Sequence, residues 1–395
     1  MTTPAFSAPD APTRLTYARA RLLLGISGVG TCVLVAAALI GFGIPAEVLS
    51  RSNEQPLLHA VTSLLLAMLI GVAMLFPFDL LGGFVVVRQR PRITGFLRRW
   101  TRGVAVHLSI GLVCITVLMS AARVGGTAAV VASFVVLQGL LAALRGPLVR
   151  MIAAFSTDAV PKRARDAAQR AGIAPKQLVL LSTSDEGFVG GWTGIAPRQL
   201  LVPARWLALP DQALVAALQR RRIIAQSGAH RRGVLGAIAW NTIGFALVLT
   251  VTSADVATAA GVLTMAAGMT LWAFVGVLVL PTPSRAAVFA IDQAAARNVG
   301  TKAVQDAIER LDRWQDDEER RSAGVETIFH PVPSRSARVA RLGHTEDQAS
   351  SLSHLHAHHL ARHALWLGWG TLSPISRAVH CNVGRPALWA MLPGD

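Results

Sequence analysis

The chain has 395 residues, of which 52% are hydrophobic and only 15% charged, so it is not an ordinary soluble protein, in which about a quarter of the residues are charged. The formal net charge is +16, but the arginines gather beside apolar runs, which explains the charge without nucleic acid as a partner. Three cysteines without paired spacing exclude a disulfide framework and a CxxC metal site.

Six apolar runs are long enough to predict membrane-spanning helices. The segments before the first run, between the second and third, and after the fourth are rich in arginine, whereas the alternate loops are poor in charge. This pattern predicts a multi-pass protein whose N- and C-termini lie in the cytoplasm, with its basic face against anionic lipid headgroups. The six runs are 22–44, 57–80, 103–122, 125–144, 234–252 and 257–280.

The polar region after the fourth run predicts a small mixed α and β module. A helix is expected over 158–171, strands within 176–183 and 198–209, and a glycine- and proline-rich turn segment between the two strands. Another helix begins at Pro210, where Asp211 in the first turn suits the helix dipole.

After the sixth run the chain returns to helical patterns. Helices are expected over 281–300, closed by Gly300, and over 301–314, and a third resumes after the prolines of 329–342. The sequence therefore predicts a mainly α polytopic membrane protein, with about six transmembrane helices and a small α+β cytoplasmic domain. The expected parts are a cytoplasmic N-terminal segment (1–20), four spans (21–152), a cytoplasmic module (153–233), two spans (234–281), its helical continuation (282–342) and a His-rich, apolar tail (343–395).

Three motifs in this order resemble the HtpX-like and CAAX-prenyl-protease-like membrane zinc metalloproteases. The stretch "LVLLSTSDEGFVGGWTGIAPRQLLVPARWLALPDQALVAAL" is similar to the family's strand, edge strand and approach helix. "SRAAVFAIDQAAA" resembles the segment that carries the third zinc ligand, and "HPVPSRSARVARL" resembles the terminal motif. The resemblance implies a bacterial inner-membrane protein with a metalloprotease-like domain, whose edge strand at Gly190, Gly191 and Trp192 binds an extended peptide.

The residues that would hold zinc in this family are missing. HExxH places two histidines on one helix face, with a glutamate as general base. The matching positions here are Arg220, Arg221 and Ile224, and the later glutamate is replaced by Val288, so that only its partner Asp292 remains. Arginine cannot ligate zinc. The sequence therefore predicts no cofactor and no zinc protease activity.

The consecutive arginines at 220–222 allow three interpretations. The simplest is a solvated helix end facing lipid headgroups. A second is an anion site, in which Arg220 or Arg221 binds a carboxylate or phosphate of a substrate. The third is an ion pair between an arginine and Asp292, which would link two helices in place of the metal.

Acid–base chemistry without a metal is a separate possibility. His330, which matches the histidine of the family's HP motif, could act with Asp292, Asp185 and Glu186 in an isomerase or epimerase of peptides. The simpler interpretation is that His330 caps a turn before Pro331.

The tail segment "SHLHAHHLARH" offers a weak metal site. His354 and His358, and likewise His359 and His363, have the i,i+4 spacing that places two imidazoles on one helix face. An amphipathic tail helix at the membrane surface is the simpler interpretation, and a pH-sensing role is the third.

Two functions are therefore expected. The first is a catalytically inactive metalloprotease homologue that binds a peptide or a membrane-protein partner. The alternative is a metal-independent, membrane-bound peptide-modifying enzyme in a biosynthetic pathway, working with a second membrane subunit.

Overall fold

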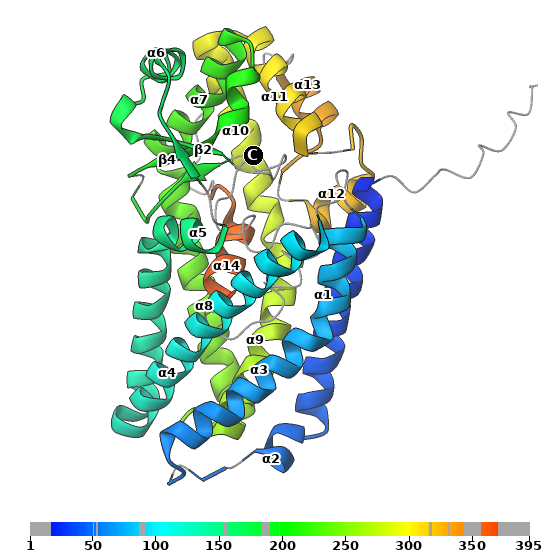
Figure 1. Cartoon of the computed structure of the whole chain (residues 1–395), viewed down its shortest axis with the longest axis vertical. Helices are drawn as coiled ribbons and strands as arrows, with labels where there is room; N and C mark the ends of the chain where they lie inside the picture. Colours follow the sequence, from blue (N-terminus) through cyan, green and yellow to red (C-terminus); the bar gives the residue numbers. More distant parts are fainter. Residues whose placement is uncertain are drawn as a thin grey trace, which may run out of the picture.

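The fold is mainly helical, with long helices at one end and a small sheet with shorter helices at the other (Figure 1). It comes from a computed structural model that describes residues 17–49, 51–52, 54–86, 92–153, 156–182, 190–196, 198–315, 318–330, 332–342 and 357–369.

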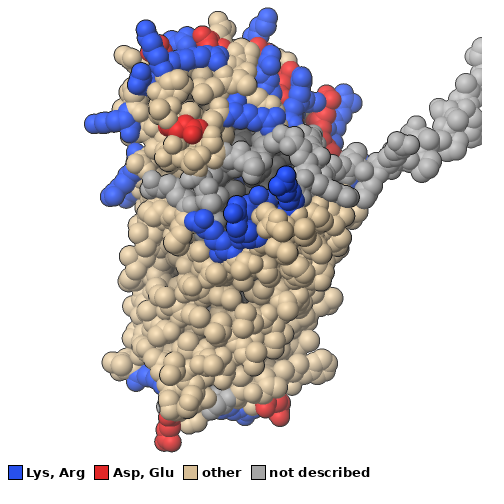
Figure 2. Space-filling view, in the orientation of Figure 1, with Lys and Arg blue, Asp and Glu red and all other residues tan. Residues whose placement is uncertain are grey.

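Five helices in the described part of the chain are long and apolar enough to cross a membrane. Large apolar side chains lie exposed along them, including Leu34, Leu58 and Val251. Figure 2 shows the same band free of charged side chains, which gather at its two ends. The chain is therefore a membrane protein. The five helices are α1 (Tyr17–Gly41), α3 (Leu57–Leu80), α4 (Ile93–Ala143), α8 (Ala229–Thr252) and α9 (Ala259–Val279).

Helix α4 contains both the third and the fourth predicted runs. Its 51 residues would extend about 77 Å as one straight helix, more than twice the thickness of a bilayer core. Gly126 breaks it, with φ 61° and ψ −155°, a conformation that favours glycine. Each limb is long enough for one span.

Short elements connect the long helices. Helix α2 (Ile44–Val48) follows α1, and a π-helical turn, η1 (Leu81–Val85), follows α3. Asp79, buried near the end of α3, accepts a hydrogen bond of 2.6 Å from the indole nitrogen of Trp100 on α4. Helix α5 (Arg145–Ala153) leads from α4 toward the sheet.

The sheet has four strands in the order β1-β2-β4-β3. The central pair, β2 (Leu178–Ser182) and β4 (Leu200–Pro203), is parallel, and both strands lie where the sequence predicts them. Two short antiparallel strands flank this pair: β1 (Ser156–Asp158) beside β2, and β3 (Gly191–Trp192) beside β4. Strand β3 is therefore the outer strand on the side of β4.

The predicted helices around the sheet are confirmed, with small changes at their ends. The shorter helices of the chain are α6 (Lys162–Arg170), α7 (Asp211–Gln226), α10 (Pro281–Val299), α11 (Thr301–Gln315), α12 (Ala323–Phe329), α13 (Arg335–Leu342) and α14 (Leu360–Trp369), with the 3-10 turns η2 (Pro175–Gln177) and η3 (Ala204–Ala208).

One apolar core lies between the sheet and the helices α6, α7, α10 and α11. It includes Trp206, Leu218, Ile224 and Ile291. Helix α10 follows α9 directly and carries the chain from the long helices to this core (Figure 1).

Candidate functional site

A buried ion-pair cluster joins three helices at the position of the predicted site. Arg220 on α7 donates from Nε to Oδ1 of Asp292 on α10 at 2.6 Å. Arg338 on α13 donates from Nε to Oδ2 at 2.7 Å and from Nη2 to Oδ1 at 3.0 Å. Arg220, Asp292 and Arg338 are only 2%, 1% and 4% exposed. One carboxylate therefore holds two arginines from different helices.

The expected solvated helix end is wrong for the first two arginines of 220–222. Arg220 and Arg221 are 2% and 1% exposed, because α7 packs against α10 and the sheet on this side. The guanidinium of Arg221 lies 5.5 Å from the ring centroid of Trp206, a cation–π geometry. The interpretation that the structure shows is the ion pair with Asp292.

The other two positions that matched zinc ligands are apolar and buried. Ile224, one turn after Arg220 on α7, is 2% exposed, and Val288, one turn before Asp292 on α10, is fully buried. Ile224 is part of the apolar core that α7 shares with α10, and Val288 is a buried residue of α10. The four positions that match the zinc site thus hold two arginines and two aliphatic side chains.

The predicted peptide-binding residues lie beside α7 and are buried. The indole nitrogen of Trp192 donates to the backbone oxygen of Arg221 at 2.6 Å, so this side chain links β3 to α7. Gly190 has φ +67°, and a Cβ there would lie 2.0 Å from the carbonyl oxygen of Leu201. Gly190 therefore allows the chain at the start of β3 to approach β4 closely, which a larger residue would prevent.

His330 is not placed for the predicted acid–base pair. It follows the last residue of α12, and its backbone nitrogen donates to the carbonyl oxygen of Glu326 at 3.3 Å. Among the described residues no hydrogen bond joins His330 to Asp292, whose two oxygens bind Arg220 and Arg338. Asp185 and Glu186 lie outside the described residues. The simpler prediction, a residue that caps a turn, agrees with the position of His330 after α12.

Burial, together with the positive charges of Arg321 and Arg362, lowers the pKa of His330 to about 3. Its imidazole is therefore neutral near neutral pH, and it is a poor proton acceptor for a general base, whose pKa should lie near the working pH. The structure gives no support to His330 and Asp292 as a catalytic pair.

This pKa predicts a pH dependence of stability. Below about pH 6.5 the unfolded chain binds a proton at His330 that the folded chain excludes until about pH 3, so the folded state loses stability as the pH falls. We expect His330→Asn to remove up to about 1.4 kcal/mol of this loss per pH unit between pH 6 and 4. Chemical unfolding in detergent measures it. Gln226→Asn, which changes an exposed residue without an ionisable group, should keep the wild-type slope, and equal slopes for all three proteins would contradict the prediction.

The histidine-rich tail is buried, so its expected place on the membrane surface is wrong for the part described. His358, His359 and His363 are 2%, 0% and 1% exposed. Nη1 of Arg145 donates to Nδ1 of His363 at 2.7 Å, which requires that this nitrogen be unprotonated. The ring of His363 meets the ring of His230 edge to face, with centroids 5.3 Å apart.

Two observations bear on the weak metal site. His354 lies outside the described residues. Within the described part of the chain, no group of three or more His, Cys, Asp or Glu side chains could hold a metal ion. His359 and His363 are related by the backbone hydrogen bond of one helical turn, and His363 binds Arg145.

Helix α14 docks among the long helices, which the sequence pattern does not predict. It lies beside α8 and near α9 in Figure 1. The backbone nitrogen of His358 donates to the carbonyl oxygen of Ala229, and Asn241 Nδ2 donates to the carbonyl oxygen of Ala364 at 3.0 Å. Trp366 is 1% exposed in an apolar cluster with residues of α4, α8 and the sheet.

The approach of the tail to α8 depends on one glycine. A Cβ at Gly233 would lie 2.2 Å from the carbonyl oxygen of His358. His230, on the same turn of α8, binds the carbonyl oxygen of Gly194 through Nε2 at 2.8 Å. His230 of α8 therefore contacts both His363 of the tail and Gly194, in the segment after β3.

Comparison with known proteins adds no relative: no protein-family model matches the chain, and a search of curated proteins gave no significant match.

Proposed function

We propose that the protein is a zinc-less homologue of the HtpX-like membrane metalloproteases that binds a peptide or a membrane-protein partner. The observation that carries the proposal is the contact of Arg220 with Asp292. It brings together the α7 position where the resemblance expects a zinc-binding histidine and the one acidic residue left from the second motif. A chance resemblance between two sequence segments 72 residues apart would not require these side chains to meet.

In this proposal the ion pairs replace the metal as the link between helices. A zinc ion in such a site is held by two helices, and its loss would leave them joined by packing alone. Here Arg220 and Arg338 bind the carboxylate of Asp292 from two sides, and Ile224 and Val288 fill the remaining space with hydrocarbon. The site has become a rigid support without a metal.

The partner would bind beside the outer edge of the sheet, where Ala196 and Arg198 after β3 are exposed although the residues of β3 itself are buried. Strand β3 pairs with β4 on one side and ends the sheet order on the other. An extended peptide can add a strand to such an edge through main-chain hydrogen bonds. Trp192, held by α7, and the close approach at Gly190 fix the position of this strand.

The proposed setting is the bacterial cytoplasmic membrane, crossed six times. The break at Gly126 supports two crossings by α4, and the arginine-rich stretches beside the apolar runs support placement of both termini and the sheet domain on the cytoplasmic side. Anionic headgroups would lie against that side.

A photo-crosslinking amino acid tests the binding function. Placed in intact cells at the exposed Arg198, just before β4, it should capture a defined partner peptide that mass spectrometry identifies. The matched control is Arg165, an exposed residue of α6 on the same domain, which should not capture that peptide. Identical products from the two positions, or none from Arg198, would count against the proposal.

The alternative, a metal-independent peptide-modifying enzyme, receives no support from the described residues. Both oxygens of Asp292 are bound to arginines, and His330 forms no hydrogen bond with it. An enzyme of this class would need another acid–base pair.

A further inference from the structure

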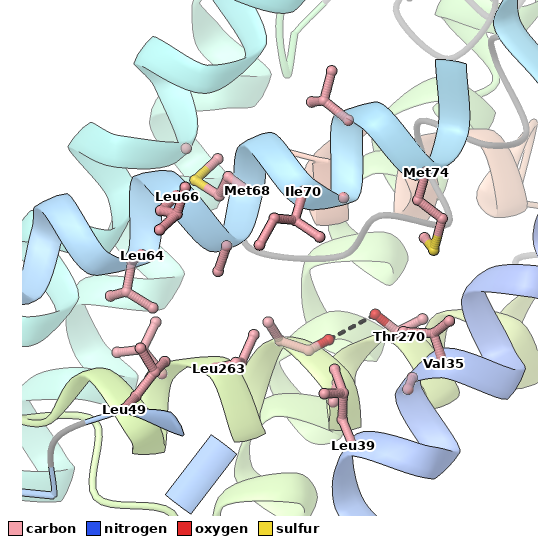
Figure 3. Close-up of a pocket in the computed structure, with 18 of the residues that line it drawn as sticks. Val35, Leu39, Leu49, Leu64, Leu66, Met68, Ile70, Met74, Leu263 and Thr270 are labelled. Carbon is pink, nitrogen blue, oxygen red and sulfur yellow. Dashed lines mark hydrogen bonds between the residues drawn. The ribbon is translucent and has the colours of Figure 1, made fainter. Parts of the chain in front are cut away.

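A cavity of about 460 Å³ lies among the long helices, away from the ion-pair cluster. Its walls come from α1, α3, α4 and α9, and α2 closes one end. Figure 3 shows the space between α3 on one side and α1 and α9 on the other, with the side chains of Leu64, Ile70, Leu39 and Leu263 around it. The cavity lies within the apolar band.

The chemistry of the walls selects hydrocarbon. Most of the lining side chains are aliphatic or methionine, and the others include Cys32, Ser63, His107 and Thr270. The two lining hydroxyl groups donate within their own helices, Ser63 to the carbonyl oxygen of His59 at 3.0 Å and Thr270 to that of Ala266 at 2.7 Å. A ligand with many hydrogen-bonding groups would leave them unsatisfied in such a site.

The volume of the cavity, about 460 Å³, is typical of a site for one small ligand or one thin, flexible chain. Within a bilayer, the abundant molecule of that shape is a lipid acyl chain.

The first turns of α4 supply positive charge for the headgroup of such a lipid. Arg98, Arg99 and Arg102 are exposed there, and Figure 2 shows basic side chains gathered at this boundary of the apolar band. His107, eight residues after Arg99 on the same helix, already lines the cavity. The two residues are about 12 Å apart along the helix axis and about 80° apart around it, so one lipid can reach both.

We propose that this cavity binds one acyl chain of an anionic membrane lipid, whose phosphate lies at Arg98, Arg99 and Arg102. An acyl chain is as well buried in the surrounding lipid as in the cavity, so burial alone does not make a lipid prefer this site. The charge at the start of α4 provides that selection, because each basic residue near the surface attracts an anionic headgroup.

The test uses the full chain in nanodiscs that contain phosphatidylglycerol with a photoreactive diazirine at mid-chain. Leu64, Ile115 and Val262 line the cavity but are only 2%, 2% and 1% exposed, so a chain must enter the cavity to label them. We expect mass spectrometry to find label on these residues. Label confined to the exposed outer residues of the helices would overturn the proposal.

A glycine substitution blocks the cavity specifically. A Cβ at Gly71, which lines the cavity, meets no atom within 4 Å, so Gly71→Leu fills the space without a backbone clash. It should reduce labelling of the three wall residues at least five-fold. The matched control is Gly139→Leu on α4, where a Cβ also meets no atom within 4 Å but which does not line the cavity. It should leave the labelling unchanged. Undiminished labelling in Gly71→Leu, with both variants equally well folded, would overturn the proposal.

Phosphatidylcholine with the same photoreactive chain tests the headgroup. We expect it to label the walls several-fold less than phosphatidylglycerol, and the triple change Arg98→Ser, Arg99→Ser and Arg102→Ser should remove the difference. Equal labelling by the two lipids in the wild type would overturn the assignment to an anionic lipid.

Discussion

Replacement of Asp292 by alanine is expected to lower the free energy of unfolding by about 3–5 kcal/mol, the cost of breaking a buried ion pair by removing one partner. In the wild type the carboxylate binds Arg220 and Arg338, both nearly inaccessible to solvent. Without it, two buried guanidinium groups lose the carboxylate that they share, and neither can become neutral by losing a proton. Chemical unfolding in mild detergent measures the change.

Two further variants show whether the effect comes from charge. Asp166→Ala removes an exposed carboxylate from α6 and should change stability by less than about 0.5 kcal/mol. The triple change Arg220→Met, Asp292→Leu and Arg338→Met replaces the whole cluster with hydrocarbon, and it should recover most of the stability that Asp292→Ala loses. An Asp292→Ala variant as stable as Asp166→Ala would show that the cluster does not hold the helices together.

Replacement of Trp366 by alanine is expected to cost about 3–5 kcal/mol, the usual range for removal of a buried tryptophan. The side chain is 1% exposed in a cluster with Val234 and Ala237 of α8, and Arg145 lies 5.6 Å from its ring. Because α14 is short and docks mainly through this face, the loss should appear first as undocking of the tail.

Hydrogen exchange distinguishes undocking from global unfolding. In Trp366→Ala, amides of 357–369 should exchange much faster than in the wild type, while those of α7 and α10 change little. Leu235→Ala, at a half-exposed leucine of α8, is the control and should leave exchange in the tail unchanged. Protection of the tail in Trp366→Ala equal to the wild type would contradict the proposed docking.

The sequence predicts elements well where a local pattern determines them. Apolar runs identify the long helices, and Pro210 with Asp211 marks the start of α7 within one residue. Gly300 marks the end of α10, where its φ of 89° suits glycine. The two-residue strand β3 gives no periodic signal, and only the family resemblance indicated it.

Contacts between distant segments were harder to predict. The pair of Arg220 and Asp292 is one of three interpretations of the sequence. Arg338 lies in the segment that resembles the family's terminal motif, but that resemblance does not indicate it as a second partner of Asp292. Arginines followed by an apolar run also satisfy the pattern of a solvated helix end, so burial depended on tertiary packing. The position of the tail is wrongly predicted for the same reason, since His363 binds Arg145, and the backbone nitrogen of His358 binds Ala229 of α8, only in the folded chain.

Restoration of the missing ligands tests the central claim, that an ion-pair cluster has replaced zinc in a metalloprotease-like site. The variant carries Arg220→His, Arg221→Glu, Ile224→His and Val288→Glu, which places the two histidines one turn apart on α7 and the glutamate one turn from Asp292 on α10. A control with Gln219→His and Ile223→His in place of the changes at 220 and 224 puts the same groups on a neighbouring, equally buried face.

The measurement is the zinc content of the purified proteins by elemental analysis after zinc exposure and dialysis. We predict about one zinc per chain in the restored variant and far less in the control and the wild type. Zinc absent from the restored variant although it folds, or bound equally by the control, would contradict the proposed origin of the site.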